Sequence, residues 1–225
     1  MPFFRDTFTA SVNQNLEDHV PDVGTSWTEL WATTPGTGWN VNASLDALTQ
    51  DNATAAGAIY TADGVYPSAQ YGVTVTVYLL YPVYLCVRIQ DAENMYAVQL
   101  AAEGAGICQL YKKVSGAWTA LGSAFDPPAA GSIVRLEIVD GTLSFYDDGV
   151  LVASVYDSDI SAAGKAGLGC GGGDELVTPS DGMSTFGRLD NFSVNNLRDR
   201  SRTRIPSRLP SQIRGTLGAS LGGRI

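Results

Sequence analysis

Apolar and polar residues alternate along much of this chain, in short runs separated by glycine, asparagine and aspartate. The segment 73–81 reads VTVTVYLLY, and the segment 133–139 reads IVRLEIV. A period of two places alternate side chains on opposite faces of an extended chain, and β-branched and aromatic residues favour strands. Within the first 197 residues, this pattern predicts ten strands: 73–81, 84–90, 95–100, 107–113, 118–121, 133–139, 143–146, 150–156, 164–172 and 186–194.

Tight turns join the clearest of these strands. Asp140-Gly141 separates 133–139 from 143–146, and Asp148-Gly149 separates 143–146 from 150–156. Such hairpin turns need positive φ at both central positions, which glycine adopts freely and aspartate tolerates better than most residues. Strands at this spacing, with no helical segments between them, predict an all-β, antiparallel jelly-roll sandwich over residues 1–197.

The last 28 residues have a different pattern, which we call the C-terminal arm (residues 198–225). All seven arginines occupy even positions, and the larger apolar residues occupy odd positions four apart. Six prolines and glycines in the segment oppose a helix, so the alternation predicts an extended arm with one arginine face and one apolar face. The residues expected to contact a partner are Arg198, Arg200, Arg202, Arg204, Ile205, Arg208, Leu209, Ile213, Arg214, Leu217, Leu221, Arg224 and Ile225. Arginine, serine, proline and glycine are also typical of disordered tails, and that alternative stays open.

The charge is distributed unevenly between these two parts. The C-terminal arm holds seven arginines and one acid, Asp199, and carries +6, so the first 197 residues carry −15 of the total of −9. An acidic body with a basic arm indicates that the arm meets an acidic surface: its own body, a neighbouring copy, another protein or a nucleic acid. The acidic body disfavours nucleic acid, because only the arm would contribute phosphate contacts.

A series of motifs resembles a known fold family. The series is Asp6-Thr7-Phe8, Trp27, a lysine-ended run with Gly-x-Trp at 111–118, the two hairpins at 133–156, GKAGL at 164–168 and LDNFSV at 189–194. It resembles the concanavalin A-like lectin/glucanase sandwich, in particular the laminin-G-like domains of bacterial and phage proteins, over residues 3–196. The resemblance implies that the first and last strands lie together, with Phe8 and Phe192 closing one edge. It implies little about function, because this fold hosts lectins, hydrolases and structural modules.

Catalytic chemistry is poorly represented. Hydrolases of this fold carry a Glu-x-Asp-x-(x)-Glu strand, which aims two carboxyl groups into a cleft, and the sequence has no such strand. His19, the single histidine, lies in an apparent loop with no nucleophile pattern near it. We therefore predict no enzymatic activity.

We also predict no cofactor and no metal ion. A calcium ion is the alternative, because members of this fold often carry one. Its ligands would come from Asp147, Asp148, Asp157, Asp159, Asp174 and Glu175, although aspartate is also common in turns. The three cysteines have no metal-like spacing, and Cys86 and Cys108 lie in apolar runs, so buried free thiols are expected.

Tryptophans offer the main candidates for a glycan site. Trp27, Trp31 and Trp39 lie in a segment rich in threonine, glycine and asparagine. Aromatic faces can stack on sugar rings, but tryptophans also pack in sandwich cores. Trp31 and Trp39 are the better glycan-binding candidates, because their sequence neighbours are more polar.

The function that we expect from sequence rests on the C-terminal arm. We predict a structural assembly protein, a phage virion accessory of the capsid decoration or cement type. The arm would anchor it to a protein partner with an acidic and apolar groove, on the capsid lattice or on a neighbouring copy. A carbohydrate-binding adhesion module is the alternative, and a glycoside hydrolase is the second alternative.

The expected location follows from that role. The N-terminal MPFFRDTF lacks the basic and apolar regions of a signal peptide. No apolar run reaches the ~18 residues of a membrane helix. We therefore expect synthesis in a host cytoplasm, location in the virion and no membrane partner.

Overall fold

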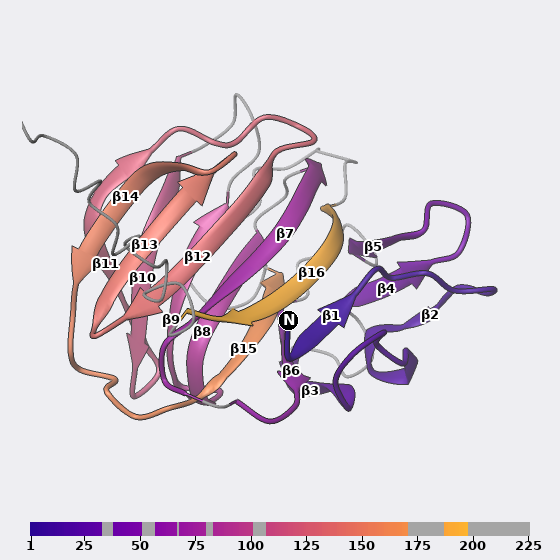
Figure 1. The fold of residues 1–225 in the computed structure, drawn as a ribbon, viewed down its shortest axis with the longest axis horizontal. Helices are drawn as coiled ribbons and strands as arrows, with labels where there is room; N and C mark the ends of the chain where they lie inside the picture. Colours follow the sequence, from indigo (N-terminus) through magenta and orange to yellow (C-terminus); the bar gives the residue numbers. More distant parts are fainter. Residues whose placement is uncertain are drawn as a thin grey trace, which may run out of the picture.

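Two antiparallel sheets form a sandwich in the computed structural model, which describes residues 1–32, 38–50, 57–66, 68–79, 83–100, 107–170 and 187–197 (Figure 1). Within these residues, one three-residue 3-10 helix, η1 (Leu16–Asp18), is the only helical element. No helix among them is long and apolar enough to cross a membrane. The predicted antiparallel jelly-roll sandwich is therefore confirmed for the body.

The first sheet has nine strands. Eight follow the order β14-β13-β12-β7-β16-β5-β4-β2, and β1 pairs with β16 beside β5. Figure 1 shows β14 at one end of this sheet and β2 at the other. Its strands are β1 (Phe4–Asp6), β2 (Gln14–Asn15), β4 (Trp39–Asn42), β5 (Ala47–Gln50), β7 (Tyr71–Leu79), β12 (Ile133–Val139), β13 (Thr142–Asp147), β14 (Val150–Tyr156) and β16 (Arg188–Asn196).

The second sheet has seven strands in the order β11-β10-β9-β8-β15-β6-β3. They are β3 (Ser26–Ala32), β6 (Ala58–Asp63), β8 (Val83–Asp91), β9 (Asn94–Leu100), β10 (Cys108–Val114), β11 (Ala117–Phe125) and β15 (Lys165–Cys170). The ten predicted strands match β7 to β16 with small differences at their ends. The segments β1 to β6 were not predicted as strands. β1, β2, β4 and β5 have four residues or fewer, and the longer β3 and β6 lack a strict alternation of polar and apolar residues.

The predicted hairpin turns have the expected backbone. Asp140 and Gly141 have φ of 48° and 83°, and Asp148 and Gly149 have φ of 46° and 81°. These turns set the register of β12, β13 and β14, in which Leu136 lies opposite Phe145 and Phe145 lies opposite Ala153. Local turn chemistry therefore determines this end of the nine-stranded sheet.

The core lies between the sheets, where the inward residues of both sheets are fully buried. Tyr71 joins them: its hydroxyl accepts a hydrogen bond from the Arg88 N–H (2.6 Å) and lies 2.9 Å from the Lys165 carbonyl oxygen. All three cysteines are free and buried, as expected for Cys86 and Cys108. Burial raises the pKa of the Cys86 and Cys170 thiols to about 12.

The first and last strands lie side by side, as the resemblance implied, with Asp6 opposite Phe192. They do not form the edge of the sheet, however. The strand β16 lies between β7 on one side and β1 with β5 on the other, and β4 and β2 continue beyond (Figure 1). Phe8 and Phe192 are both fully buried, and Phe192 packs edge-on against Trp27 at 4.9 Å. The expectation that Phe8 and Phe192 close an edge was therefore wrong.

Candidate functional site

The outer face of the seven-stranded sheet, which points away from the nine-stranded sheet, carries a second apolar cluster. Along β8 and β9 the side chains alternate. Leu85, Val87, Tyr96 and Val98 face the main core, whereas Tyr84, Cys86, Met95 and Ala97 form the cluster on the other side, with Ile59 and Ile89. All of these residues are buried, and Trp31 and Trp118 pack against the cluster while remaining partly exposed. A sheet face that points away from the core is normally polar, so this face is chemically unusual.

Two tryptophans from opposite edges of this sheet meet over one lysine. The strands β3 and β11 are the edge strands. The Lys113 Nζ lies 5.8 Å from the ring centroid of Trp31 in β3 and 5.3 Å from that of Trp118 in β11. Five inter-strand steps separate β10 from β3, about 24 Å in a flat sheet. Side chains would not bridge that distance, so the sheet must curve toward its outer face.

Further aromatic contacts extend this group. Tyr84 stacks on Trp118 with ring centroids 5.9 Å apart and 20° between the planes, and Tyr111 meets Trp118 edge-on at 6.2 Å. We call Trp31, Tyr84, Tyr111, Lys113 and Trp118 the aromatic cluster. The indole nitrogen of Trp118 is buried and has no hydrogen-bond partner among the described residues.

The register places amide side chains in line with the aromatic rings. One row crosses the sheet through directly opposed residues: Trp31, Ile59, Gly169, Tyr84, Gln99 and Gln109. The Gln109 amide donates a hydrogen bond to the Leu121 carbonyl at 2.8 Å, which holds its orientation. Both glutamines are buried, Gln99 at 4% and Gln109 at 6% exposure.

Small side chains line the middle strands on this outer face. Thr61, Gly167, Cys86 and Ala97 lie opposite one another in turn, in the row next to that of Tyr84. A Cβ atom added at Gly167 would lie 2.0 Å from the Tyr60 carbonyl oxygen, so a larger residue is excluded there. Cys86, Met95 and Ala97 in this region are fully buried, so this floor is covered.

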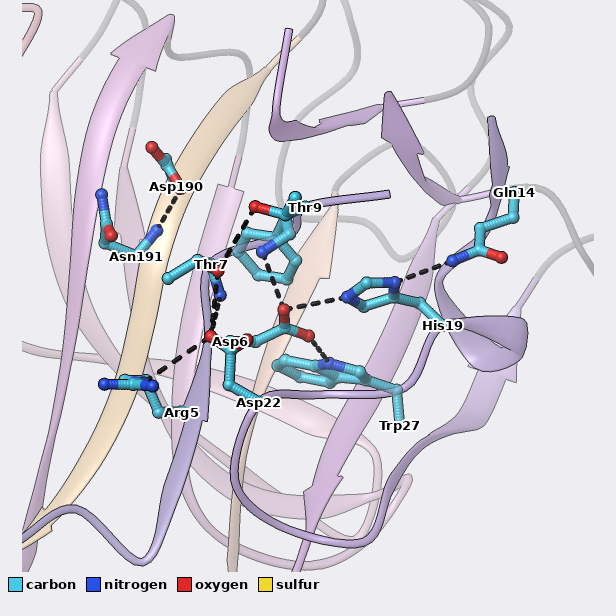
Figure 2. Close-up of polar contacts among 11 residues, drawn as sticks. Arg5, Asp6, Thr7, Thr9, Gln14, His19, Asp22, Trp27, Asp190 and Asn191 are labelled. Carbon is cyan, nitrogen blue, oxygen red and sulfur yellow. Dashed lines mark hydrogen bonds and ion pairs between the residues drawn. The ribbon is translucent and has the colours of Figure 1, made fainter. Parts of the chain in front are cut away.

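A separate polar cluster surrounds Asp6, which is 1% exposed (Figure 2). Its carboxylate accepts hydrogen bonds from the Phe8 N–H (2.7 Å) and the Trp27 indole N–H (2.7 Å), and lies 3.0 Å from the His19 Nε2. The Gln14 amide nitrogen lies 2.8 Å from the His19 Nδ1. An amide N–H donated to Nδ1 would place the ring hydrogen on Nε2, directed at Asp6.

This histidine–carboxylate pair is a structural device. A hydrolytic triad needs a nucleophile on the second ring nitrogen, and here that nitrogen contacts the amide of Gln14. The cluster joins β1, the segment after η1 and the start of β3, as Figure 2 shows. Asp6, whose carboxylate would be costly to bury alone, thereby fastens the N-terminal segment to the sandwich.

Three of the carboxylates considered for calcium have other partners. The Lys112 Nζ binds Asp157 at 2.6 Å and also binds Asp159, and Asp148 accepts the Ile133 N–H at 2.8 Å. Among the described residues, no group of three or more histidine, cysteine, aspartate or glutamate side chains is placed to hold a metal ion. Asp174 and Glu175 lie outside the described residues.

The predicted glycan-binding residues have different fates. Trp31 belongs to the aromatic cluster, and its binding of a glycan stays a prediction. Trp39 is 1% exposed, so its ring belongs to the core and is not available to a ligand. Its neighbours Asn40 and Asn42 lie on the other face of β4, where they are partly exposed.

Sequence reasoning missed Tyr84, Tyr111, Lys113 and Trp118 as site residues. The Ser115-Gly116 turn does place Lys113 opposite Trp118, so two of the five cluster residues carried a local signal. The C-terminal arm, residues 198–225, lies outside the described residues, and its partner-binding residues stay predictions.

No family model matches the sequence, and no curated protein matches it at a significant level. Solved structures do match. The carbohydrate binding module CBM66 from Bacillus subtilis superposes with a TM-score of 0.53 at 12% identity, covering 76% of this chain and 95% of the module.

Two more structures match over most of their length. LamAcat from Zobellia galactanivorans has a TM-score of 0.54 at 11% identity, over 86% of this chain and 97% of LamAcat. A Bacillus subtilis protein of unknown function with a galectin-like fold has a TM-score of 0.53 at 12% identity, over 84% and 96%. At such identities the likeness establishes the fold alone. The body of this chain is a jelly-roll β-sandwich of the concanavalin A-like type.

Proposed function

We propose that this chain binds a carbohydrate on the outer face of its seven-stranded sheet. The observation that carries the proposal is the aromatic cluster, in which rings from both edge strands converge on Lys113. Among the similar structures, CBM66 is a carbohydrate binding module by name, which supports this function over the assembly role expected from sequence.

The aromatic rings carry the recognition. The partly exposed rings of Trp31 and Trp118 offer flat apolar faces on which the C–H groups of a sugar ring stack. Gln99 and Gln109, in the row of Tyr84, are buried, so their amides support this face and do not contact the ligand. Lys113 lies within cation–π distance of both tryptophan rings, so it orients them before the ligand arrives.

Binding without catalysis fits the same residues. Glycoside hydrolysis needs two carboxyl groups flanking the scissile bond. The outward residues of β8, β9 and β10 in the apolar cluster and its neighbouring rows are aromatic, apolar, amide or lysine, and none of them carries a carboxyl group. We therefore propose a binding module.

Glycan-array screening followed by calorimetry tests this function. Trp31→Ala and Trp118→Ala should each raise the Kd of the best glycan about tenfold or more, equivalent to about 1.4 kcal/mol. Tyr78→Ala removes an aromatic ring from the other sheet, beneath Arg188, and should leave the Kd unchanged. Unaltered affinity in folded Trp118→Ala, or no glycan bound by the wild-type chain, would contradict the proposal.

The virion assembly role stays a separate prediction, carried by the sequence of residues 198–225 alone. If it is right, removing the arm should abolish incorporation into particles. Normal incorporation without the arm would end that prediction and leave glycan binding untouched.

A further inference from the structure

The strand β14 is an exposed sheet edge without the usual protection. Val150, Leu151, Val152 and Tyr156 are 67%, 53%, 41% and 67% exposed, and the strand contains no charged residue and no proline. Among the described residues, nothing pairs with its outer side. Natural proteins normally protect long apolar edges with charges, prolines or covering segments, so β14 calls for a covering strand.

The C-terminal arm begins at the correct end of this sheet. Leu197 N donates a hydrogen bond to the Gln70 carbonyl oxygen at 3.4 Å, next to the last residue of β16. A straight row of opposed residues leads from there to β14: Asn196, Tyr71, Ile138, Leu143 and Val155. The four inter-strand steps span about 19 Å. Seven extended residues, 198–204, span about 23 Å and therefore reach β14.

The charges along this path match the arm. Asp140 is exposed at the β12–β13 turn, and Asp157 and Asp159 follow the end of β14. The Asp159 side chain is 56% exposed while it binds Lys112. The first part of the arm, residues 198–204, carries Arg198, Arg200, Arg202 and Arg204. The part that follows has no acidic residue, and its larger apolar residues occupy odd positions. The arginine-rich part thus crosses an acidic rim, and the apolar part meets an apolar edge.

We infer that the arm adds to the edge of β14 of its own chain as an antiparallel strand. A chain that arrives at Tyr156 and continues toward Val150 runs antiparallel to β14, as the sheet requires. Ile205 opposite Tyr156 gives the pair Ser207 with Ser154, and Leu209 then lies beside Val152, the extra residue of a bulge in β14. Directly opposed residues share a face, so the apolar residues of the arm lie beside the exposed apolar residues of β14.

The prolines of the arm agree with this register. Backbone N–H groups point alternately to the two sides of a strand, so Pro206 and Pro210, four residues apart, lack an N–H on the same side. The odd residues from Ile205 to Ser211 direct their N–H groups to the opposite side, toward β14. The new edge then carries two prolines, which prevents a further strand from adding.

A second copy of the chain fits the edge less well. Two β14 strands paired antiparallel would bring Asp147 and Asp148 of one copy toward Asp157 and Asp159 of the other. Like charges so placed repel, whereas the arm brings arginines to the same residues. The arm of the same chain is also present at high effective concentration.

Disulfide trapping in the full chain tests the register. The variant S154C/S207C should form an intramolecular disulfide at least tenfold faster than S154C/S220C, whose second cysteine would lie well beyond Val150. The native thiols are buried, and the pKa of Cys86 and Cys170 is about 12, so they react slowly at pH 8. Equal rates in the two variants would overturn the inference, and a covalent dimer would show that a second copy takes the edge.

Hydrogen exchange gives a second readout without cysteines. Leu209→Asp should accelerate amide exchange in β14 at least tenfold, because its neighbour Val152 would then face a charge. Leu221→Asp, beyond the proposed pairing, is the matched control and should leave β14 exchange unchanged. Unchanged exchange in both variants would overturn the inference.

Discussion

The two sheets of this sandwich treat their outer faces in opposite ways. On the seven-stranded sheet, Tyr84, Cys86, Met95 and Ala97 point away from the core and are nevertheless buried. On the nine-stranded sheet, Ile133, Leu151 and Tyr156 are 52%, 53% and 67% exposed. Both faces carry apolar residues, but one curves so that aromatic rings from its two edges cover the floor. Curvature, more than composition, therefore decides which outer face is buried.

A charge introduced on each outer face should give the largest difference in unfolding free energy between the two faces. Met95→Lys places an ammonium group at a fully buried position directly across from Lys113, and should cost about 4 kcal/mol of unfolding free energy. Ile133→Lys, on the exposed face, should change it by about 0.5 kcal/mol or less. Urea unfolding measures both variants. Equal losses would show that the two faces do not differ in burial.

The hydrogen bonds of Tyr71, which join the two sheets, should have the next largest effect on the unfolding free energy. Tyr71→Phe removes the hydroxyl that accepts the Arg88 N–H and contacts the β15 carbonyls. Leaving that buried N–H unpaired should cost about 2 kcal/mol. Tyr78→Phe, on the outer face of the nine-stranded sheet, should cost little in the same urea experiment. A loss in Tyr71→Phe no greater than in Tyr78→Phe would mean that the hydroxyl does not join the sheets.

The ion pair between Lys112 in β10 and Asp157 after β14 joins the two sheets. It should contribute about 1 kcal/mol to the unfolding free energy, and only above acidic pH. Burial alone would raise the pKa of Asp157, but hydrogen bonds from Lys112 and Tyr96 outweigh it and lower that pKa below its usual value. The stabilisation is therefore present above the ordinary carboxyl pKa near ~4, and is lost as pH falls through the lowered folded pKa.

Unfolding free energies measured from pH 7 to pH 2.5 check this sign. The difference between wild type and Asp157→Asn should shrink as pH falls. The exposed Asp126→Asn serves as the control and should show no such trend. A difference that grows toward low pH would contradict the assignment.

The smallest expected effect tests whether the two edge strands of the seven-stranded sheet, β3 and β11, are energetically coupled. Trp31 and Trp118 lie on opposite edge strands but share Lys113, so Trp31→Leu and Trp118→Leu should be non-additive in unfolding free energy by about 0.5–1 kcal/mol. Trp31→Leu combined with Tyr146→Leu, on the other sheet, should be additive. Additivity in both cycles would show that the edges of the curved sheet are energetically independent.

Much of the fold was predictable because it depends on local patterns. The strands from Tyr71 onward alternate over five or more residues, and Asp-Gly turns join several of them, so both their existence and their register follow from neighbouring residues. The strands before Asp63 are mostly short, and several of their pairings are distant: β1 pairs with β16, and β3 with β6. Nothing local indicates such pairing.

The candidate site was predictable only in part. Trp31 was selected for its polar neighbours, but the same criterion selected the buried Trp39. Sequence neighbours at odd offsets lie on the opposite face of a strand, so they describe the wrong environment. The pair of Lys113 with Trp118 followed from a hairpin, whereas the contact with Trp31 needs the curvature of five intervening strand steps.

The sequence by itself determined the alternating strands, the positive-φ turns and the separation of an acidic body from an arginine-bearing arm, because each depends on residues a few positions apart. The tertiary structure decided that Trp39 is buried, that Asp6 and His19 meet, and that Trp31 and Trp118 converge on one lysine. Those outcomes depend on how distant strands pair and how far the sheet curves, which no short segment encodes.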